Sequence, residues 1–242
     1  MFHSSEAIVL QLIPHKDHNA IVKLFSRKSG LTSCWISSLH SKSSGIRIAG
    51  LQPLTIINAV IDQRETKQLS TLKEMQISFF PSGISLTSGG IKKSSIAIFI
   101  AELLTHTIKE TATDESLYDF LRESIVLLSD TDKKCANFHI VFMLNLSNHL
   151  GLLPNNSFSP QTPYLNLEEG TYQAKAPLHT AFLYPNESEL ISKLSALAIS
   201  SFANAKIPSA LRKNILHGLL KYFEIHTGMA PLKSHLVLEE VF

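Results

Sequence analysis

Short apolar runs separated by polar breaks fill the first 80 residues, and this spacing predicts β-strands. The runs are rich in β-branched residues, whereas the breaks carry Ser, Gly, Lys and Arg. The predicted strands cover residues 7–13, 20–25, 31–38, 54–61 and 69–80. Five short strands at this spacing favour a small barrel, and a barrel of this length has the size of an OB-fold.

The pattern becomes helical after a Ser- and Gly-rich stretch at residues 81–90, which we interpret as a linker. Apolar residues three and four apart predict helices over 96–108 and 117–128, and residues 137–150, which are apolar on nearly every side, predict a central buried helix. Residues 154–185 contain five prolines and are expected to be irregular, with one hairpin. Further helices are expected from a capping box at 186–189 to about Phe202, from Pro208 onward, and over 232–241. The fold class is therefore α+β. A five-stranded OB-fold barrel (1–80) and the linker (81–90) precede an all-helical domain (91–242) with the insertion at 154–185.

Composition agrees with a folded chain. Of the 242 residues, 44% are hydrophobic and 17% are charged, and the net charge is only +2, which excludes intrinsic disorder. The longest apolar run is too short for a transmembrane helix, and residues 1–13 lack the basic start of a secretory signal, so we expect a cytoplasmic protein. Cys34 and Cys135 are a hundred residues apart and are expected to be free thiols.

Positive charge is concentrated between His15 and Gly50, where Asp17 is the one acidic residue. Such an excess favours a polyanion such as nucleic acid, although a solvated basic face without a partner has the same composition. The candidate phosphate-contacting residues are Lys16, Lys23, Arg27, Lys28, Lys42 and Arg47. Trp35, the single tryptophan, is either a stacking platform for bases or a core residue of its strand.

Catalytic signatures are absent from the sequence. No phosphate-binding loop, nucleophile elbow or dinucleotide fingerprint occurs. His15 and His18 offer two imidazoles without a third ligand at a useful spacing, so no metal site is expected there. The other histidines are interpreted as packing and surface residues. The sequence therefore predicts a protein that is not an enzyme.

Several short motifs, in order along the chain, resemble the RecO family of bacterial recombination mediators. The opening strands match at Ala7-Ile-Val-Leu10 and Ala20-Ile-Val-Lys-Leu-Phe25, and the basic loop ends in Gly50-Leu-Gln-Pro-Leu-Thr55. Phe142-Met-Leu-Asn-Leu-Ser-Asn-His-Leu-Gly-Leu-Leu-Pro154 is similar to the central helix of the family, and Pro231-Leu-Lys-Ser234 to its ending.

The resemblance implies a non-enzymatic role in DNA repair. Family members bind single- and double-stranded DNA, anneal complementary strands, pair with RecR, and help RecA load onto DNA covered by single-strand binding protein. A nucleoid-associated cytoplasmic protein is then expected. Many members carry a four-cysteine zinc site just after the central helix. Residues 151–185 contain no cysteine here, so neither zinc nor another cofactor is expected.

The resemblance also implies that the helical domain docks the acidic, apolar C-terminal tail of single-strand binding protein. Basic residues usually stand before the phenylalanine that opens the central-helix motif, but here Ile140 and Val141 occupy those positions. The positive charge is then expected from Lys133, Lys134, Arg212 and Lys213. An alternative interpretation is an interaction adaptor, in which the helical domain binds a partner and the barrel serves as scaffold.

Overall fold

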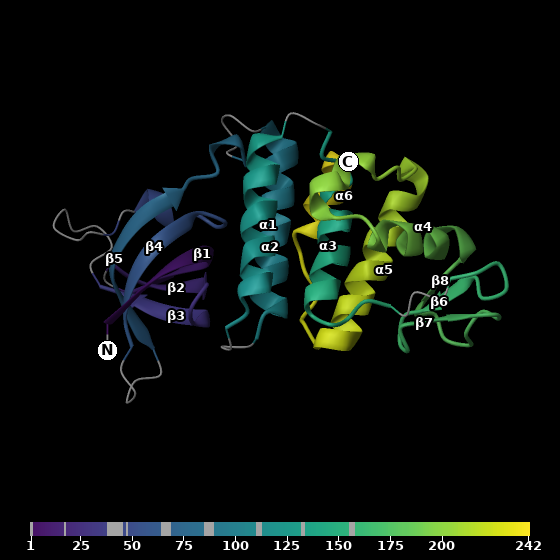
Figure 1. The fold of residues 1–242 in the computed structure, drawn as a ribbon, viewed down its shortest axis with the longest axis horizontal. Coiled ribbons are helices and arrows are strands. Elements are labelled where there is room, and N and C mark those ends of the chain that lie inside the picture. The colour runs from purple at the N-terminus through teal and green to yellow at the C-terminus, as the bar shows by residue number, and fades with distance from the viewer. Residues whose placement is uncertain are drawn as a thin grey trace. The chain divides into compact units, whose positions relative to one another are not determined.

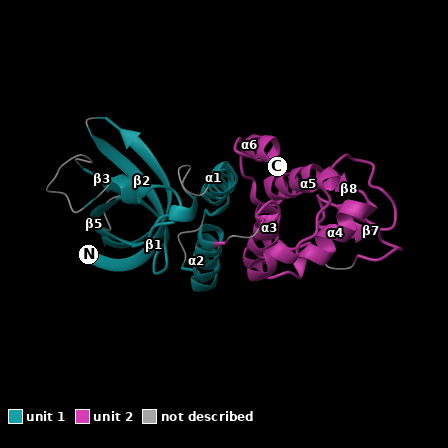
Figure 2. Ribbon diagram, turned by 90° about the horizontal axis from the view of Figure 1, so that it is seen from above, with its two compact units in different colours: residues 1–130 teal, residues 131–242 magenta. Residues whose placement is uncertain are grey.

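The structure, a computed structural model, divides the chain into two compact units, residues 1–130 and 131–242 (Figure 2). The described residues are 2–16, 18–37, 46, 48–63, 69–84, 90–109, 113–131, 134–154 and 158–242.

The first unit contains a closed five-stranded barrel (Figure 1), which confirms the predicted architecture. Its strands are β1 (Phe2–His15), β2 (Asn19–Ser26), β3 (Gly30–Ile36), β4 (Ile56–Asp62) and β5 (Ser70–Phe79), with a 3₁₀ turn, η1 (Ile48–Leu51), before β4. The strand order is β1-β2-β3-β5-β4, and β1 closes the barrel by pairing with β4. The β3–β5 pair is parallel and short, and the other neighbours are antiparallel.

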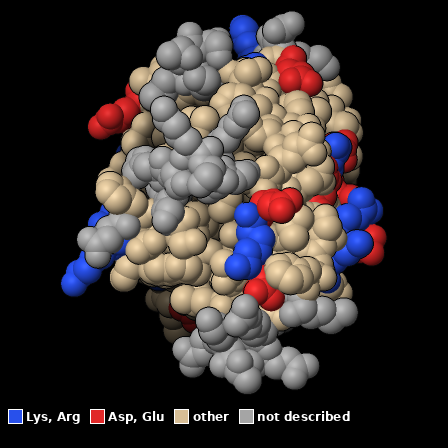
Figure 3. All heavy atoms as spheres, turned by 90° about the vertical axis from the view of Figure 1, so that its left-hand side faces the viewer, with Lys and Arg blue, Asp and Glu red and all other residues tan. Residues whose placement is uncertain are grey.

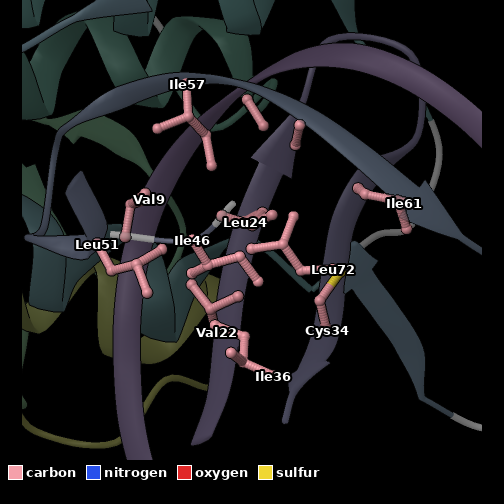
Figure 4. Close-up of a cluster of buried hydrophobic side chains, with 12 residues drawn as sticks. Val9, Val22, Leu24, Cys34, Ile36, Ile46, Leu51, Ile57, Ile61 and Leu72 are labelled. Carbon is pink, nitrogen blue, oxygen red and sulfur yellow. The ribbon is translucent and has the colours of Figure 1, made fainter. Parts of the chain in front are cut away.

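Alternation along the strands fills the barrel interior. In β2, Ala20, Val22 and Leu24 are buried, whereas Ile21 and Lys23 between them are only half-buried. Apolar side chains from all five strands and from η1 meet in one cluster (Figure 4). Burial of each Val, Leu or Ile side chain contributes about 1.5–3 kcal/mol, so this cluster stabilises the barrel strongly.

Two helices complete the first unit, α1 (Gly90–Thr107) and α2 (Glu115–Asp130), after a short 3₁₀ turn, η2 (Ser82–Ile84). Helix α1 packs against β1, and Phe25 of β2 stacks on Tyr118 of α2 with ring centroids 6.3 Å apart. Ile8 of β1 lies between two core residues in sequence and is also fully buried. The helices therefore cover one outer face of the barrel, so they belong to its compact unit although they follow the predicted linker. Linker residues 85–89 lie outside the described residues.

The second unit is mainly helical and also contains a small antiparallel sheet in the order β7-β6-β8. Its elements are α3 (Phe138–His149), β6 (Tyr164–Asn166), β7 (Thr171–Gln173), β8 (Phe182–Leu183), α4 (Pro185–Ser195), η3 (Ile199–Asn204), α5 (Ser209–Thr227) and α6 (His235–Val241). The sheet lies in the segment predicted as irregular with one hairpin, and β8 adds a strand to that hairpin. Helix α4 ends at Ser195 rather than near Phe202, which belongs to η3.

Both cysteines are buried thiols rather than halves of a disulfide, as predicted. Burial raises the pKa of the Cys34 thiol to about 12, so it stays protonated at neutral pH. Across the described ranges, no helix combines the length and the apolar character that crossing a membrane requires.

Candidate nucleic-acid interface

Trp35 lies on the outer face of the barrel. Its neighbours in β3, Cys34 and Ile36, point into the core, whereas Trp35 is half-buried and faces the other way. It pairs across the ladder with Ile21 of β2, and its ring meets His15 edge-on with centroids 5.3 Å apart. Trp35 is therefore not a residue of the barrel core, and part of its ring is accessible on the outer face beside β2.

Lys23 and Lys16 share this part of the barrel. Lys23 projects from β2 between its register partners Gln11 of β1 and Ser33 of β3. Lys16 is exposed in the β1–β2 turn, where its carbonyl oxygen accepts hydrogen bonds from the backbone and side chain of Asn19. In OB-folds, the face of strands 2 and 3 and the loop between strands 1 and 2 are the usual binding surface for oligonucleotides.

Arg27 and Lys28 lie at the opposite end of β2, in the turn to β3. The eight residues of β2 span about 24 Å, so this turn and Lys16 cannot contact the same phosphate. The Arg27 guanidinium lies 3.4 Å from the Glu115 carboxylate, 3.2 Å from that of Asp119, and over the Tyr118 ring. Its charge is thus balanced by helix α2, a partnership that the sequence analysis did not anticipate.

Lys28 remains exposed and borders a polar groove of 520 Å³. The groove runs beside the first half of β3 and is lined by Lys28, Ser29, Leu31, Thr32, Ser33, Gln63, Ser70 and Thr113. Hydroxyl groups and one lysine suit a phosphate backbone, because both donate hydrogen bonds to phosphate oxygens. Strand β3 therefore connects a polar groove at its start to an aromatic surface near its end.

Figure 3 shows one face of the barrel unit, on which the described Lys and Arg residues lie singly or in small groups, several beside Asp or Glu. The sequence-predicted Lys42 and Arg47 lie outside the described residues. The candidate interface in the described part of the chain thus consists of Trp35, Lys16, Lys23 and Lys28.

The second unit brings Arg212 and Lys213 to a cavity of 230 Å³. The cavity is also lined by His139, Ser209, Leu216, Leu238, Glu239 and Phe242. Arg212 donates from Nε to Asn137 and from Nη1 to the backbone oxygen of Phe242, which fixes its position. Lys134 is exposed and is not among the lining residues, and Lys133 lies outside the described residues.

Burial and the nearby Arg212 charge lower the pKa of His139 to about 3. This imidazole is therefore neutral at physiological pH. The cations at the cavity are Arg212 and Lys213, and Lys213 Nζ is ion-paired with the Glu239 carboxylate at 2.7 Å.

Sequence reasoning missed a group formed by His217, His235 and Glu239. Potential ligand atoms of the three side chains all lie within 4.8 Å of one another. Burial raises the pKa of the Glu239 carboxyl, but hydrogen bonds from Lys213 and His217 outweigh it and the net pKa is lowered. The local signal was the four-residue spacing of His235 and Glu239, which places both on one face of a helix.

A closed five-stranded barrel with an aromatic and basic outer face, joined to a helical unit, defines the class as an OB-fold protein. Comparison with family models matches residues 1–80 to the recombination protein O N-terminal domain and residues 89–236 to its C-terminal domain. The chain therefore belongs to the recombination protein O family.

Relatives of similar length carry the name DNA repair protein RecO. Identity is 32% to the protein of Flavobacterium psychrophilum, with 98% of each chain covered. It is 30% to that of Phocaeicola vulgatus and 28% to that of Azobacteroides pseudotrichonymphae, with 100% of each chain covered in both cases. The family models divide the chain near the predicted linker, whereas the compact units divide it after residue 130.

Proposed function

We propose that this protein is a non-enzymatic recombination mediator that binds single-stranded DNA along the outer face of β2 and β3. The observation that carries the proposal is the outward Trp35 beside Lys23, with Lys16 and Lys28 at the two ends of the strand pair. OB-folds hold single strands in two ways: bases stack on aromatic side chains, and a row of basic side chains contacts the phosphates of the nucleic acid.

Neutralised phosphates also explain how such a protein anneals complementary strands. Two bare strands repel each other, and lysines that contact phosphate reduce this repulsion, so complementary segments can meet. In this proposal the protein also acts on double-stranded DNA and works with RecR to help load RecA onto DNA covered by single-strand binding protein. The membership in the recombination protein O family supports this role.

The test is fluorescence anisotropy of a labelled single-stranded oligonucleotide across a salt series. Three phosphate contacts, from Lys16, Lys23 and Lys28, predict a slope of log affinity against log salt of about −2. Lys23→Ala should reduce its magnitude by about 0.7 for every base sequence. Trp35→Ala should weaken binding by about 1–3 kcal/mol, and Trp35→Phe should retain most of it.

Lys73→Ala is the matched control, because it removes the same charge from an exposed site on β5 of the same barrel. Equal loss in Lys73→Ala and Lys23→Ala would show general attraction without a site on β2 and β3. Unchanged affinity for DNA in both Lys23→Ala and Trp35→Ala would show that the outer face of β2 and β3 does not bind the oligonucleotide.

A second binding function is supported by the cavity of the helical unit. We propose that it docks the acidic, apolar tail of single-strand binding protein, with Arg212 and Lys213 facing its carboxylates and Leu216 and Leu238 facing its apolar side chains. The combination of cations with an apolar wall in one cavity carries this proposal.

The test is binding of a labelled peptide with that tail sequence to the full chain. Lys213→Ala should weaken binding several-fold, and Lys206→Ala, an exposed lysine of the same unit that does not line the cavity, should not. Peptide binding without DNA binding at moderate salt would favour the adaptor alternative. Equal affinity for the wild type and Lys213→Ala would place the peptide elsewhere.

A further inference from the structure

The group formed by His217, His235 and Glu239 joins the last two helices of the chain. His217 comes from α5, and His235 and Glu239 come from α6, where their four-residue spacing puts them on one face. The three side chains converge with potential ligand atoms within 4.8 Å of one another. Two helices are enough to build this group, because α6 supplies two of its three side chains.

Two imidazoles and one carboxylate form a recognised donor set. Zinc sites use two His and one Glu with a further position open, and imidazole nitrogen also binds copper, nickel and cobalt ions. Tetrahedral zinc at about 2.0–2.1 Å from each ligand separates the ligand atoms by about 3.4 Å. The observed separations of at most 4.8 Å exceed this spacing by no more than about 1.4 Å, and a bound ion would draw the three side chains together by that amount.

The present contacts already orient two of the three groups. His217 Nε2 hydrogen-bonds Glu239 Oε1, and the rings of His217 and His235 meet edge-on with centroids 6.0 Å apart. The second carboxylate oxygen of Glu239 lies 2.7 Å from Lys213 Nζ. A hydrogen-bonded donor behind a ligating carboxylate is the usual outer partner at metal sites.

A second observation concerns His235 itself. Its Nδ1 atom is buried, and within the described ranges it has no hydrogen-bond partner. Buried polar atoms nearly always have a partner, and leaving one without costs free energy. A metal ion bound at this nitrogen would supply the interaction that the protein does not.

We infer that His217, His235 and Glu239 form a binding site for a divalent transition-metal ion, with zinc as the best fit. Lys213 positions the carboxylate through its other oxygen, and a water molecule completes the coordination. The site lies on α5 and α6, far along the chain from the cysteine-free segment 151–185. The inference departs from the sequence-based expectation, which included no metal and interpreted His217 and His235 as packing or surface residues.

The expected role is to fasten α6 to α5. Among its described residues, α6 buries one side chain, Leu238, and a helix of seven residues has little stability of its own. A metal ion bound by His217 and two side chains of α6 would hold the two helices together without the burial of further apolar surface. Since Glu239 and Lys213 also line the 230 Å³ cavity, the bound ion would fix one wall of it.

The experiment titrates zinc chloride alone into the full chain, after dialysis against a chelator, in competition with a chromogenic zinc indicator. One zinc ion per chain is expected. His235→Ala and Glu239→Gln should each weaken binding at least 10-fold, since even second-layer partners of a metal account for about 10–100-fold in affinity.

His179→Ala is the matched control, because His179 also lies by a carboxylate, 3.7 Å from Glu168, but belongs to no three-ligand group in the described chain. Its zinc affinity should equal that of the wild type. Hydrogen exchange gives a second readout, in which zinc should slow exchange of α6 amides in the wild type but not in His235→Ala.

Thermal unfolding without metal checks that each variant is folded. Absence of stoichiometric binding in the wild type would overturn the inference. Binding that survives the combined His217→Ala, His235→Ala and Glu239→Gln changes would do so too, because the ion would then be held elsewhere. Neither result depends on DNA or peptide binding, so the proposed function is tested separately.

Discussion

Glu6 links three parts of the first unit through one carboxylate. Its Oε1 accepts a hydrogen bond of 2.7 Å from Ser78 of β5, and its Oε2 accepts from the Tyr118 hydroxyl at 3.0 Å and from Arg122 Nε at 3.2 Å. Burial raises the pKa of the Glu6 carboxyl, but these hydrogen bonds and the Arg122 charge outweigh it, so the net pKa is lowered. In turn, burial and the Glu6 charge raise the pKa of Tyr118.

This carboxylate makes the first unit sensitive to acid. Because the folded pKa lies below the unfolded value, the stabilisation is fully present above the unfolded pKa and is lost as pH falls through the folded pKa. Glu6→Gln should therefore lower stability at neutral pH and flatten the loss of stability below about pH 4.5. Urea unfolding at a series of pH values measures this. Glu74→Gln, at an exposed position of β5, should show the same dependence of unfolding free energy on pH as the wild type. If Glu6→Gln also shows the wild-type dependence, Glu6 is not the source of the acid sensitivity.

Strands and helices with a strong apolar composition were predictable from sequence because that signal is local. The strand predicted over 54–61 corresponds to β4, Ile56–Asp62, and the helix predicted over 137–150 corresponds to α3, Phe138–His149. Strand β1 is longer than predicted, since its polar residues before Ala7 pair with β4. Pairing with a neighbouring strand overrides the weak apolar pattern there.

The candidate interface was predictable only in part, because partners distant in sequence decide which side-chain charges are already paired within the protein. Arg27 and Lys28 are adjacent in one turn, yet Arg27 pairs with residues 88 and 92 positions further along the chain. The same limit applies to His217, whose partners lie across a helix–helix contact. Alternation in β3 did contain the information that Trp35 faces outward, once the buried positions Cys34 and Ile36 were known.

The η2 turn fits against the end of helix α2 only because residue 83 is glycine. A β-carbon at Gly83 would lie 2.0 Å from the backbone oxygen of Ser129, which cannot rotate away. That oxygen also accepts a hydrogen bond of 3.0 Å from Lys93. Gly83→Ala should force these elements apart and cost about 1–3 kcal/mol or more in unfolding free energy.

Gly90→Ala is the comparison, because Gly90 has a φ of +71° and a β-carbon added there would meet no atom within 4 Å. Its cost should be limited to the left-handed backbone, about 1–2 kcal/mol. Denaturant unfolding of both variants separates the two causes. A Gly83→Ala protein as stable as the wild type would mean that η2 does not depend on this close approach.

The compact unit that contains the barrel extends to residue 130, whereas the N-terminal family match ends at residue 80. We predict that residues 1–130 fold by themselves and that residues 1–80 do not. Without α1 and α2, outward side chains such as Ile8 and Phe25 would lose their cover, at about 1.5–3 kcal/mol each. That loss is a large part of the roughly 5–15 kcal/mol that stabilises a domain.

Thermal unfolding monitored by circular dichroism tests this pair of fragments. The longer one should show a cooperative transition, and the shorter one a broad transition or aggregation. A cooperative transition in residues 1–80 would show that the barrel alone is the folding unit.

Trp35 gives the protein an optical probe of its own. It is the single tryptophan among 242 residues, so the tryptophan fluorescence of the protein comes from one residue on the outer face of β3. The edge-on contact with His15 places a titratable ring next to that emitter. A stacked base should quench the emission, and an event confined to the second unit should leave it unchanged, so binding at the barrel can be followed on the unlabelled protein.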